Sequence, residues 1–261
     1  MPFSFKNKTA VITGASSGLG AEFARRLARE GARLVLAARR KNRLEALKQE
    51  LNGLSDFIHV IEADLSREQR VEEFIAELER LPHPVEILIN NAGFGMIGAY
   101  DEADWNRLDE LYRLDMITLA RLSRWAGETM RKRGSGRILN VASTASFQPL
   151  PYMAAYGAAK AFVSSLSLAL YQELKPSGVM VSCLYPGKTE TEFFEAARMS
   201  GEKFANQVSS MPADRVVRVG LEGLRRGDPL IIPGFFNKMV YHLSKVSPKK
   251  ITLALTEGLF K

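Results

Sequence analysis

The chain alternates between two kinds of segment. Short, nearly continuous apolar runs rich in Val, Ile and Leu have the pattern of strands buried on both faces of a parallel sheet. The longer segments between them repeat their apolar residues with the period of an α-helix. This order predicts an α/β fold, a parallel sheet with helices on both faces. The predicted strands are residues 9–13, 33–38, 57–62, 86–89, 137–141, 179–184 and 230–232.

The predicted helices lie between these strands, and several end at a helix-breaking residue. Gly31, Pro82 and Gly134 follow the first, third and fourth helices. The predicted helices are residues 19–30, 43–51, 68–81, 104–133, 154–174 and 213–226. Residues 193–211 lack a clear period, which predicts a flexible lid or two short helices. Without a linker or repeat, residues 1–261 are predicted to form one domain, with a cofactor half up to about residue 140 and a catalytic half at 141–261.

Composition narrows the class of protein. The net charge of +7 and pI near 9.5 favour anionic ligands, from phosphate-bearing cofactors to nucleic acid and lipid. The single cysteine, Cys183, excludes an internal disulfide and lies in an apolar stretch, so we expect a buried thiol. The three histidines lack metal-ligand spacing, and we expect no metal site. With no signal-like or membrane-spanning apolar segment, we expect a soluble cytoplasmic protein.

A glycine-rich turn, "TGASSGLG", follows the first predicted strand and opens the first helix. Such a turn lets a pyrophosphate lie against a helix N-terminus, because the glycines permit a tight bend and a close approach of backbone to ligand. A simple tight turn is the alternative, but the strand before it and the helix after it favour nucleotide binding. The candidate cofactor-binding residues of the turn are Gly14, Ser16, Ser17, Gly18, Leu19 and Gly20.

The second predicted strand ends in the basic stretch "AARRKNR". In dinucleotide folds an acidic residue here binds the ribose 2′-hydroxyl of NAD, whereas a guanidinium suits the 2′-phosphate of NADP. Cations at a helix start oppose its dipole, so a bound anion explains them better than a solvated surface does. We therefore expect NADP(H), with Arg39 as the selecting residue and Arg40 assisting it.

Two further strand ends carry groups suited to a nucleotide. Asp64 and Leu65 follow the third strand, where the carboxylate can accept a hydrogen bond from the adenine amino group. The small residues of "INNAG", among them Asn91, Ala92 and Gly93, follow the fourth and let backbone pass close to a flat ligand. In a parallel sheet these ends meet at one edge, so the sequence predicts one cofactor site there.

The helix after the fifth strand contains "YGAAK", which places Tyr156 and Lys160 on one helix face. An ammonium beside a phenol favours the phenolate and makes the tyrosine a usable general acid or base. Ser143 follows the fifth strand and can hydrogen-bond a substrate oxygen at the same edge. A Tyr–Lys pair by itself is most often a surface contact.

Together these motifs resemble the short-chain dehydrogenase/reductase family over nearly the whole chain, with "PGKTET" as a further match. The resemblance implies a doubly wound Rossmann-type parallel sheet of about seven strands. It implies that Tyr156 donates the proton, that Lys160 lowers its pKa and binds the nicotinamide ribose, and that Ser143 positions the carbonyl. Arg39 is at the family's NADP-selecting position. The residues expected to meet the nicotinamide are Pro186, Gly187, Thr189 and Thr191.

One position departs from the family pattern. Where the family usually has an asparagine, whose backbone carbonyl holds a water leading to the lysine, this chain has Asp115. A backbone carbonyl survives this exchange, so the relay can too. The additional carboxylate can alter the pKa of Tyr156, or Asp115 can make a different helix contact.

An apolar pocket is expected to receive the substrate, a hydrophobic ketone, aldehyde or secondary alcohol. A place in the core or at an interface is the alternative for each of its candidate residues. These candidates are Phe94, Met96, Phe147, Tyr152 and Phe193.

The C-terminal stretch has Met239, Val240, Leu243 and Val246 at helical spacing among lysines. A core-docked helix with a solvated basic rim is favoured over peripheral membrane contact, which is not excluded. By the family resemblance, the long helices flanking the fifth strand form the usual dimer surface, and we expect a homodimer or homotetramer.

The sequence favours an NADPH-dependent carbonyl reductase. A non-enzymatic NADP(H)-binding regulator is the main alternative, although such a sensor has no need of Ser143, Tyr156 and Lys160 together. Nucleic-acid binding is disfavoured, because the basic residues are dispersed and no reading motif accompanies them.

Overall fold

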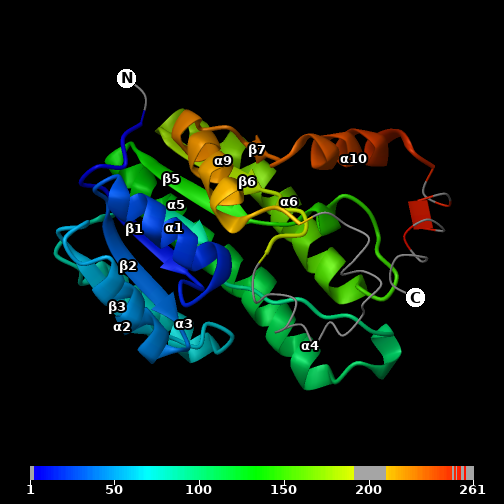
Figure 1. The fold of residues 1–261 in the computed structure, drawn as a ribbon, viewed down its shortest axis with the longest axis horizontal. Helices are drawn as coiled ribbons and strands as arrows, with labels where there is room; N and C mark the ends of the chain where they lie inside the picture. Colours follow the sequence, from blue (N-terminus) through cyan, green and yellow to red (C-terminus); the bar gives the residue numbers. More distant parts are fainter. Residues whose placement is uncertain (1–2, 191–209, 249, 251, 254–255, 257–261) are drawn as a thin grey trace.

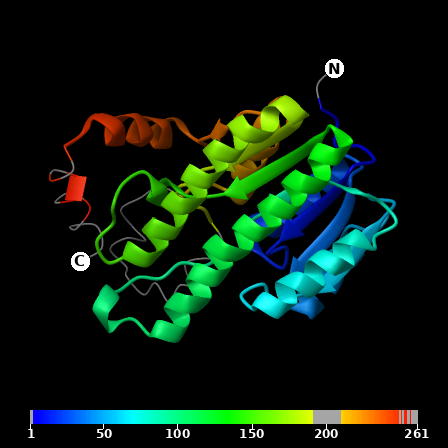
Figure 2. The ribbon, with the colours of Figure 1, turned by 180° about the vertical axis from the view of Figure 1, so that it is seen from behind.

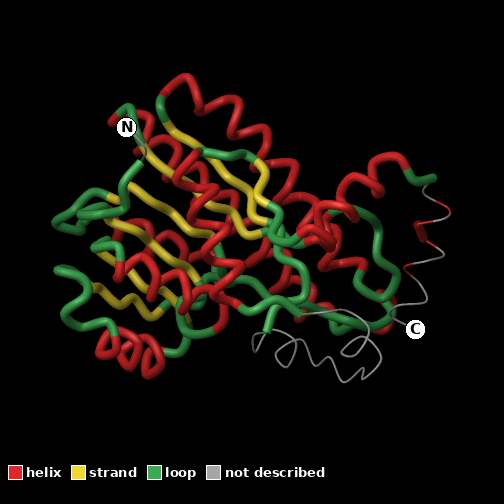
Figure 3. The backbone as a smooth tube through the Cα atoms, turned by 45° about the horizontal axis from the view of Figure 1, so that its top comes forward, coloured by secondary structure: helices red, strands yellow, loops and turns green. Residues whose placement is uncertain are grey.

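A computed structural model describes residues 3–190, 210–248, 250, 252–253 and 256. Its centre is a seven-stranded parallel sheet with the order β3-β2-β1-β4-β5-β6-β7 (Figure 3). The strands are β1 Thr9–Thr13, β2 Arg33–Ala38, β3 Ile58–Glu62, β4 Val85–Asn90, β5 Gly136–Val141, β6 Val179–Leu184 and β7 Leu230–Ile231. The predicted Rossmann-type sheet is therefore confirmed.

Helices cover both faces of the sheet because each presents an apolar stripe to it. Helices α1 (Gly18–Arg29), α2 (Lys41–Glu50) and α9 (Ala213–Arg226) pack on the face at the front of Figure 1. Helices α3 (Glu68–Glu79), α5 (Leu119–Arg133) and α6 (Ala154–Leu174) cover the opposite face, which is at the front of Figure 2. The strand order reverses between β1 and β4, and ligands of such folds bind at this crevice beyond the carboxyl ends of the strands.

The segment predicted as one helix at 104–133 is divided in the structure. Helix α4 spans Trp105–Tyr112, a π-helical segment, η2, spans Arg113–Thr118, and α5 continues from Leu119. The spacing of apolar residues in the sequence does not distinguish an α-helix from a helix that contains a wider, π-type turn. Such π segments are frequent at functional sites, and this one carries Asp115.

Shorter elements complete the described chain. Three single turns, η1 Tyr100–Glu102, η3 Thr144–Ser146 and η4 Lys175–Ser177, lie in its connections, and the helix α10 spans Phe235–Val246 at the far end from β3 (Figure 1). Cys183 is buried in β6, as predicted. Among the described residues, no helix has both the length and the apolar character needed to cross a membrane.

Candidate active site

The structure brings Ser143, Tyr156, Lys160 and Asp115 together at the carboxyl edge of the sheet. Ser143 lies just beyond β5, and Tyr156 and Lys160 lie one turn apart near the start of α6. The Lys160 ammonium is 5.6 Å from the centroid of the Tyr156 ring. Tyr156 and Lys160 are both buried, so their charges interact with little screening by water.

The Lys160 ammonium is held by two oxygens. Its Nζ is 2.8 Å from Oδ2 of Asp115 and donates a hydrogen bond of 3.2 Å to the carbonyl oxygen of Val141. The other carboxylate oxygen of Asp115 accepts from the backbone N–H of Phe94, at 3.2 Å. The carboxylate thus fastens the loop after β4 to the lysine of α6. Asp115, whose contact the sequence left open, is a direct ion-pair partner of Lys160.

Gly93 leaves the space that this arrangement needs. A Cβ atom at this position would lie 2.8 Å from both carboxylate oxygens of Asp115. Any side chain at position 93 would therefore displace the carboxylate or the loop. Gly93 thus makes room for the Asp115–Lys160 pair, and the close approach of a ligand to this loop stays a prediction.

The ion pair changes the proton affinity of all three ionisable groups. Burial raises the pKa of Tyr156, Lys160 and a hydrogen bond from Ser143 lower it, and Asp115 raises it again, so that the net pKa is raised. Burial lowers the pKa of Lys160, but Asp115 and Tyr156 reverse this and the net pKa is also raised. For Asp115, burial raises the pKa above its ordinary value despite the opposing effect of Lys160. Tyr156 therefore retains its proton readily, and the Lys160 charge is partly compensated.

The glycine turn has the geometry of a pyrophosphate cradle. Gly14 and Gly18 have φ values of +69° and +55°, which glycine adopts without strain. A Cβ at Gly20 would lie 2.2 Å from the carbonyl oxygen of Gly14, so the turn closes only on a glycine. The turn delivers the chain to the first residues of α1, whose N–H groups have no partner within the helix and suit an anion. These residues fit a dinucleotide.

The two predicted cofactor-selecting arginines make different contacts. Arg40 donates from Nη2 to the hydroxyls of Ser17 and Ser16, at 2.7 and 3.1 Å. Arg39 reaches away, to Oε1 of Glu110 on α4, at 2.9 Å. The structure thus places Arg40 beside the glycine turn and Arg39 in an exposed ion pair. Both lie directly after β2.

The other predicted cofactor residues lie along the same sheet edge. Asp64 accepts from the hydroxyl of Ser66, at 2.7 Å, and Asn91 donates to the carbonyl oxygen of Thr13, at 2.9 Å. The first bond shapes the loop after β3, and the second ties the end of β4 to the end of β1. The remaining members of this set are Leu65, Ala92, Pro186, Gly187 and Thr189, whereas Thr191 lies outside the described residues.

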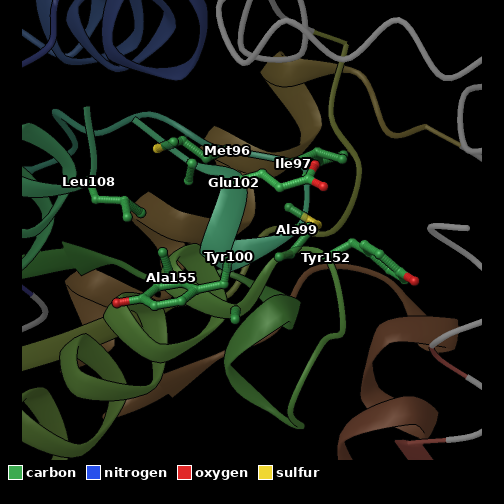
Figure 4. A pocket seen from close by; sticks show the side chains of 12 residues that line it. Met96, Ile97, Ala99, Tyr100, Glu102, Leu108, Tyr152 and Ala155 are labelled. Atoms are coloured by element: carbon green, nitrogen blue, oxygen red, sulfur yellow. The ribbon is translucent and has the colours of Figure 1, made fainter. Parts of the chain in front are cut away.

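A pocket of about 200 Å³ adjoins the start of α6 (Figure 4). Two of the predicted substrate residues, Met96 and Tyr152, line it, together with Ile97, Tyr100 and other residues that sequence reasoning missed. Ile97 and Tyr100 belong to the connection before α4, which has no periodic pattern to mark its inward side. Tyr152 has a φ of +62°, an uncommon value for a bulky residue, and its carbonyl accepts from Gly98 N–H at 2.9 Å. This hydrogen bond joins the pocket wall at Gly98 to the wall at Tyr152.

Two predicted substrate residues pack elsewhere. Phe94 is buried beneath the guanidinium of Arg107, 3.7 Å from the ring centroid. Phe147 packs between Tyr185 and Tyr241, with centroid separations of 5.2 and 5.1 Å. Neither is among the residues that line the pocket. Large aromatic side chains that lie next to the core pack into that core. Phe193 lies outside the described residues.

Comparison with known proteins agrees with this geometry. The family model described as short chain dehydrogenase matches residues 8–201. A short-chain dehydrogenase from Sphingobium yanoikuyae in complex with NADPH is 33% identical, with a TM-score of 0.81 over 92% of this chain and 96% of that one. A bulky-bulky ketone specific alcohol dehydrogenase from Comamonas testosteroni is 32% identical, with a TM-score of 0.78 over 93% and 95%.

A third structure extends the range of cofactors among the relatives. A short chain dehydrogenase/reductase from Burkholderia phymatum, in complex with NAD, is 26% identical, with a TM-score of 0.82 over 99% of this chain and 98% of that one. Relatives of this chain thus bind either dinucleotide. On the match over residues 8–201, this chain is an oxidoreductase that belongs to the short-chain dehydrogenase/reductase family.

Proposed function

We propose that this protein interconverts a carbonyl and an alcohol on a hydrophobic small molecule, with NADP(H) as the cofactor. The observation that carries the proposal is the cluster of the buried Tyr156 and Lys160 with the half-buried Ser143, next to a pocket that reaches the neighbouring residue Ala155. A phenol and an ammonium buried close to a pocket are costly to maintain for structure alone. Such a pair is suited to moving a proton.

The choice of NADP(H) rests on the charge at the end of β2. Ala38 ends the strand and Arg39 and Arg40 follow it, so two guanidinium groups stand where NAD-selecting folds have a carboxylate. A guanidinium binds a phosphate through two parallel hydrogen bonds. The NADPH complex of the Sphingobium relative supports the same choice. The NAD complex of the Burkholderia relative makes NAD(H) the alternative cofactor to test.

In the proposed reaction the glycine turn and the arginines after β2 would hold NADP(H), which when bound would supply the hydride for the carbonyl carbon. Ser143 donates a hydrogen bond to the substrate oxygen and holds it beside Tyr156. The Tyr156 hydroxyl transfers its proton to that oxygen as negative charge develops, and the phenolate left behind is stabilised by the Lys160 ammonium. The alcohol product leaves neutral. In the reverse direction the phenolate accepts the proton.

The Asp115–Lys160 pair changes the pH range in which Tyr156 keeps its proton. Because the Asp115 carboxylate compensates part of the Lys160 charge, the phenolate is less stabilised than it would be by a lone lysine. The neutral phenol therefore persists to higher pH, as a weaker acid. Reduction is the proposed direction because NADP(H) is the proposed cofactor.

A bulky apolar carbonyl is the proposed substrate class. The pocket walls combine Met96, Ile97, Leu108 and Tyr152 with a carboxylate, Glu102, among them. Apolar walls favour burial of a hydrocarbon body, and few polar groups remain to bind a charged one. The Comamonas relative, described as acting on bulky ketones, is consistent with this.

We further propose a single-domain, cytoplasmic homodimer or homotetramer. Exposed apolar residues, Ile117 of η2 and Leu168 of α6, lie on the helices that flank β5. Apolar residues on a helix pair of this kind suit a contact between identical subunits. The one cysteine, Cys183, is buried, in keeping with a chain that needs no disulfide.

The variant Tyr156→Phe tests the proposed chemistry. It removes the proton donor, so kcat for reduction of a bulky ketone by NADPH should fall by about a hundredfold or more. NADPH affinity, measured by fluorescence titration, should change little. Tyr171→Phe makes the same substitution further along α6, away from the cluster, and should keep full turnover.

Two outcomes would contradict the proposal. Full turnover by Tyr156→Phe would remove the tyrosine from the reaction. NADPH binding by the wild-type protein, with no turnover across a panel of ketones, aldehydes and secondary alcohols, would favour the non-enzymatic regulator.

A further inference from the structure

Helix α10 presents its large apolar residues outward. The exposed fractions are 85% for Phe235, 61% for Phe236, 41% for Met239, 52% for Leu243 and 78% for Val246. At about 100° per residue, these five positions fall within an arc of about 100° on one side of the helix. We call these five residues the outer stripe. The core-docked helix favoured by the sequence is not what the structure shows.

The opposite side of α10 holds it against the active-site half of the protein. The Tyr241 ring packs on Phe147, with centroids 5.1 Å apart. The Asn237 amide donates to the Pro233 carbonyl at 2.8 Å and lies where a Cβ on Gly187 would meet it at 2.7 Å. Contacts from α10's more polar side therefore fix its rotation. The outward stripe is a consequence of how α10 docks.

Positive charge flanks the outer stripe. Lys238 and Lys245 are exposed on one border of the arc, with His242 between them and the stripe. The sequence carries Lys249 and Lys250 soon after the helix and has no Asp or Glu between Asp228 and Glu257. A helix with an apolar face and lysines along its border has the composition of one that lies in a membrane interface.

We propose that α10 binds the surface of an anionic lipid bilayer. The outer stripe enters the boundary between head groups and acyl chains, and Lys238 and Lys245 extend to lipid phosphates. The charge distribution favours lipid over a second copy of the chain. A two-fold contact through the stripe would bring the same basic border from each copy together, with no acidic partner from residues 229–256.

Binding in this orientation has a consequence for the site. The inner side of α10 touches Gly187, on the proposed cofactor loop, and Phe147, in the loop that continues to the pocket residue Tyr152. A bilayer under α10 would therefore lie beside the segments that form the site. This part of the inference rests on the proposed function, because a hydrophobic substrate would concentrate in that bilayer. The binding itself does not depend on catalysis.

Vesicle co-sedimentation of the full-length protein tests the inference. Wild-type protein should pellet with vesicles of equimolar phosphatidylcholine and phosphatidylglycerol, much less with phosphatidylcholine alone, and less as salt is added. Phe235→Asp should lower the partition coefficient by about tenfold or more, because a large apolar group is replaced by an anion. Leu54→Asp, which alters an exposed apolar residue after α2, should bind like the wild type.

A second pair of variants tests the charge. Lys238→Glu/Lys245→Glu should lower partitioning into the anionic vesicles by at least about tenfold. Lys48→Glu/Lys132→Glu makes the same change in net charge on exposed lysines of α2 and α5 and should retain most of the binding. Unchanged NADPH affinity and circular dichroism establish that each variant is folded.

The proposal would be overturned if the wild-type protein did not pellet with the anionic vesicles, or if Phe235→Asp pelleted as well as the wild type. It would also be overturned if the wild type bound no vesicles and light scattering showed that Phe235→Asp had lost self-association. The last would make the outer stripe a subunit interface. Turnover by a protein that does not bind vesicles would leave the proposed function standing and remove only this inference.

Discussion

Two ion pairs made by adjacent elements hold basic side chains of the site in opposite ways. Glu110, on α4, pairs with Arg39 at 2.9 Å, and the side chains are 57% exposed for Arg39 and 24% for Glu110. Asp115, on η2, pairs with Lys160 at 2.8 Å, and the exposed fractions are 0% for Asp115 and 5% for Lys160. The distances are nearly the same, but the surroundings differ.

Burial decides what each pair can do. Water and ions screen the Arg39–Glu110 pair, so its partners separate at little cost and the guanidinium can turn to a phosphate. The Asp115–Lys160 pair lies in a region of low dielectric, where separation leaves an uncompensated charge. The first pair suits a residue that must exchange partners on ligand binding. The second holds the lysine in place and adds to the raised pKa of Tyr156, of which burial is the main cause.

Stability should separate the two pairs most strongly. Asp115→Ala leaves the Lys160 ammonium buried without its partner and should lower the free energy of unfolding by about 3–5 kcal/mol. Glu110→Ala breaks the pair with Arg39 and a second pair with Arg107, and each loss should lower it by about 0–1 kcal/mol. Urea unfolding followed by circular dichroism measures both. Equal losses would mean that the Lys160 charge is compensated by another route.

Cofactor affinity should change next in magnitude. Arg39→Asp replaces a phosphate-binding guanidinium by an anion, and the Kd of NADPH should rise by about a hundredfold while that of NADH changes by only a few fold. Arg40→Asp should act in the same direction, since Arg40 lies against Ser17. Lys48→Asp, at the other end of α2, is the charge control. Equal losses for both cofactors would contradict a role of the arginines in selecting NADP.

The pH profile should show the smallest of the three effects. Burial is the main cause of the raised pKa of Tyr156, and the Asp115 carboxylate adds to it, so Asp115→Asn should lower that pKa while keeping a hydrogen-bonding group at the position. Reduction needs the protonated phenol, and its kcat should therefore begin to fall at a lower pH than in the wild type. Oxidation needs the phenolate and should become active at a lower pH.

Measuring kcat against pH in both directions checks this shift. A merely structural role of Asp115 would lower kcat without moving either profile. An upward shift would mean that Lys160 loses its proton once Asp115 is gone, which contradicts the assigned role.

The sheet and the positions of several candidate site residues could be predicted because their signals are local. Strand β1 at Thr9–Thr13 and β2 at Arg33–Ala38 have the predicted bounds, since a continuous apolar run is visible without knowledge of its neighbours. The spacing of Tyr156 and Lys160 places them on one helix face wherever that helix packs. The resemblance to the family then predicted that Tyr156 and Lys160 lie at one edge of the sheet.

The tertiary structure alone decided three other features. Asp115 meets Lys160 only because η2 and the start of α6 pack together, and the sequence does not encode this distance. The pocket walls at Ile97 and Tyr100 belong to loops whose inward side no periodicity marks.

The orientation of α10 is the third such feature. The sequence shows the helical spacing of its apolar residues, but the same stripe can face a core, a partner or a membrane. Contacts of Asn237 and Tyr241 with segments distant in sequence turn the apolar side outward. Periodicity along a chain therefore determines which residues share a face, whereas the packing of distant segments determines what that face meets.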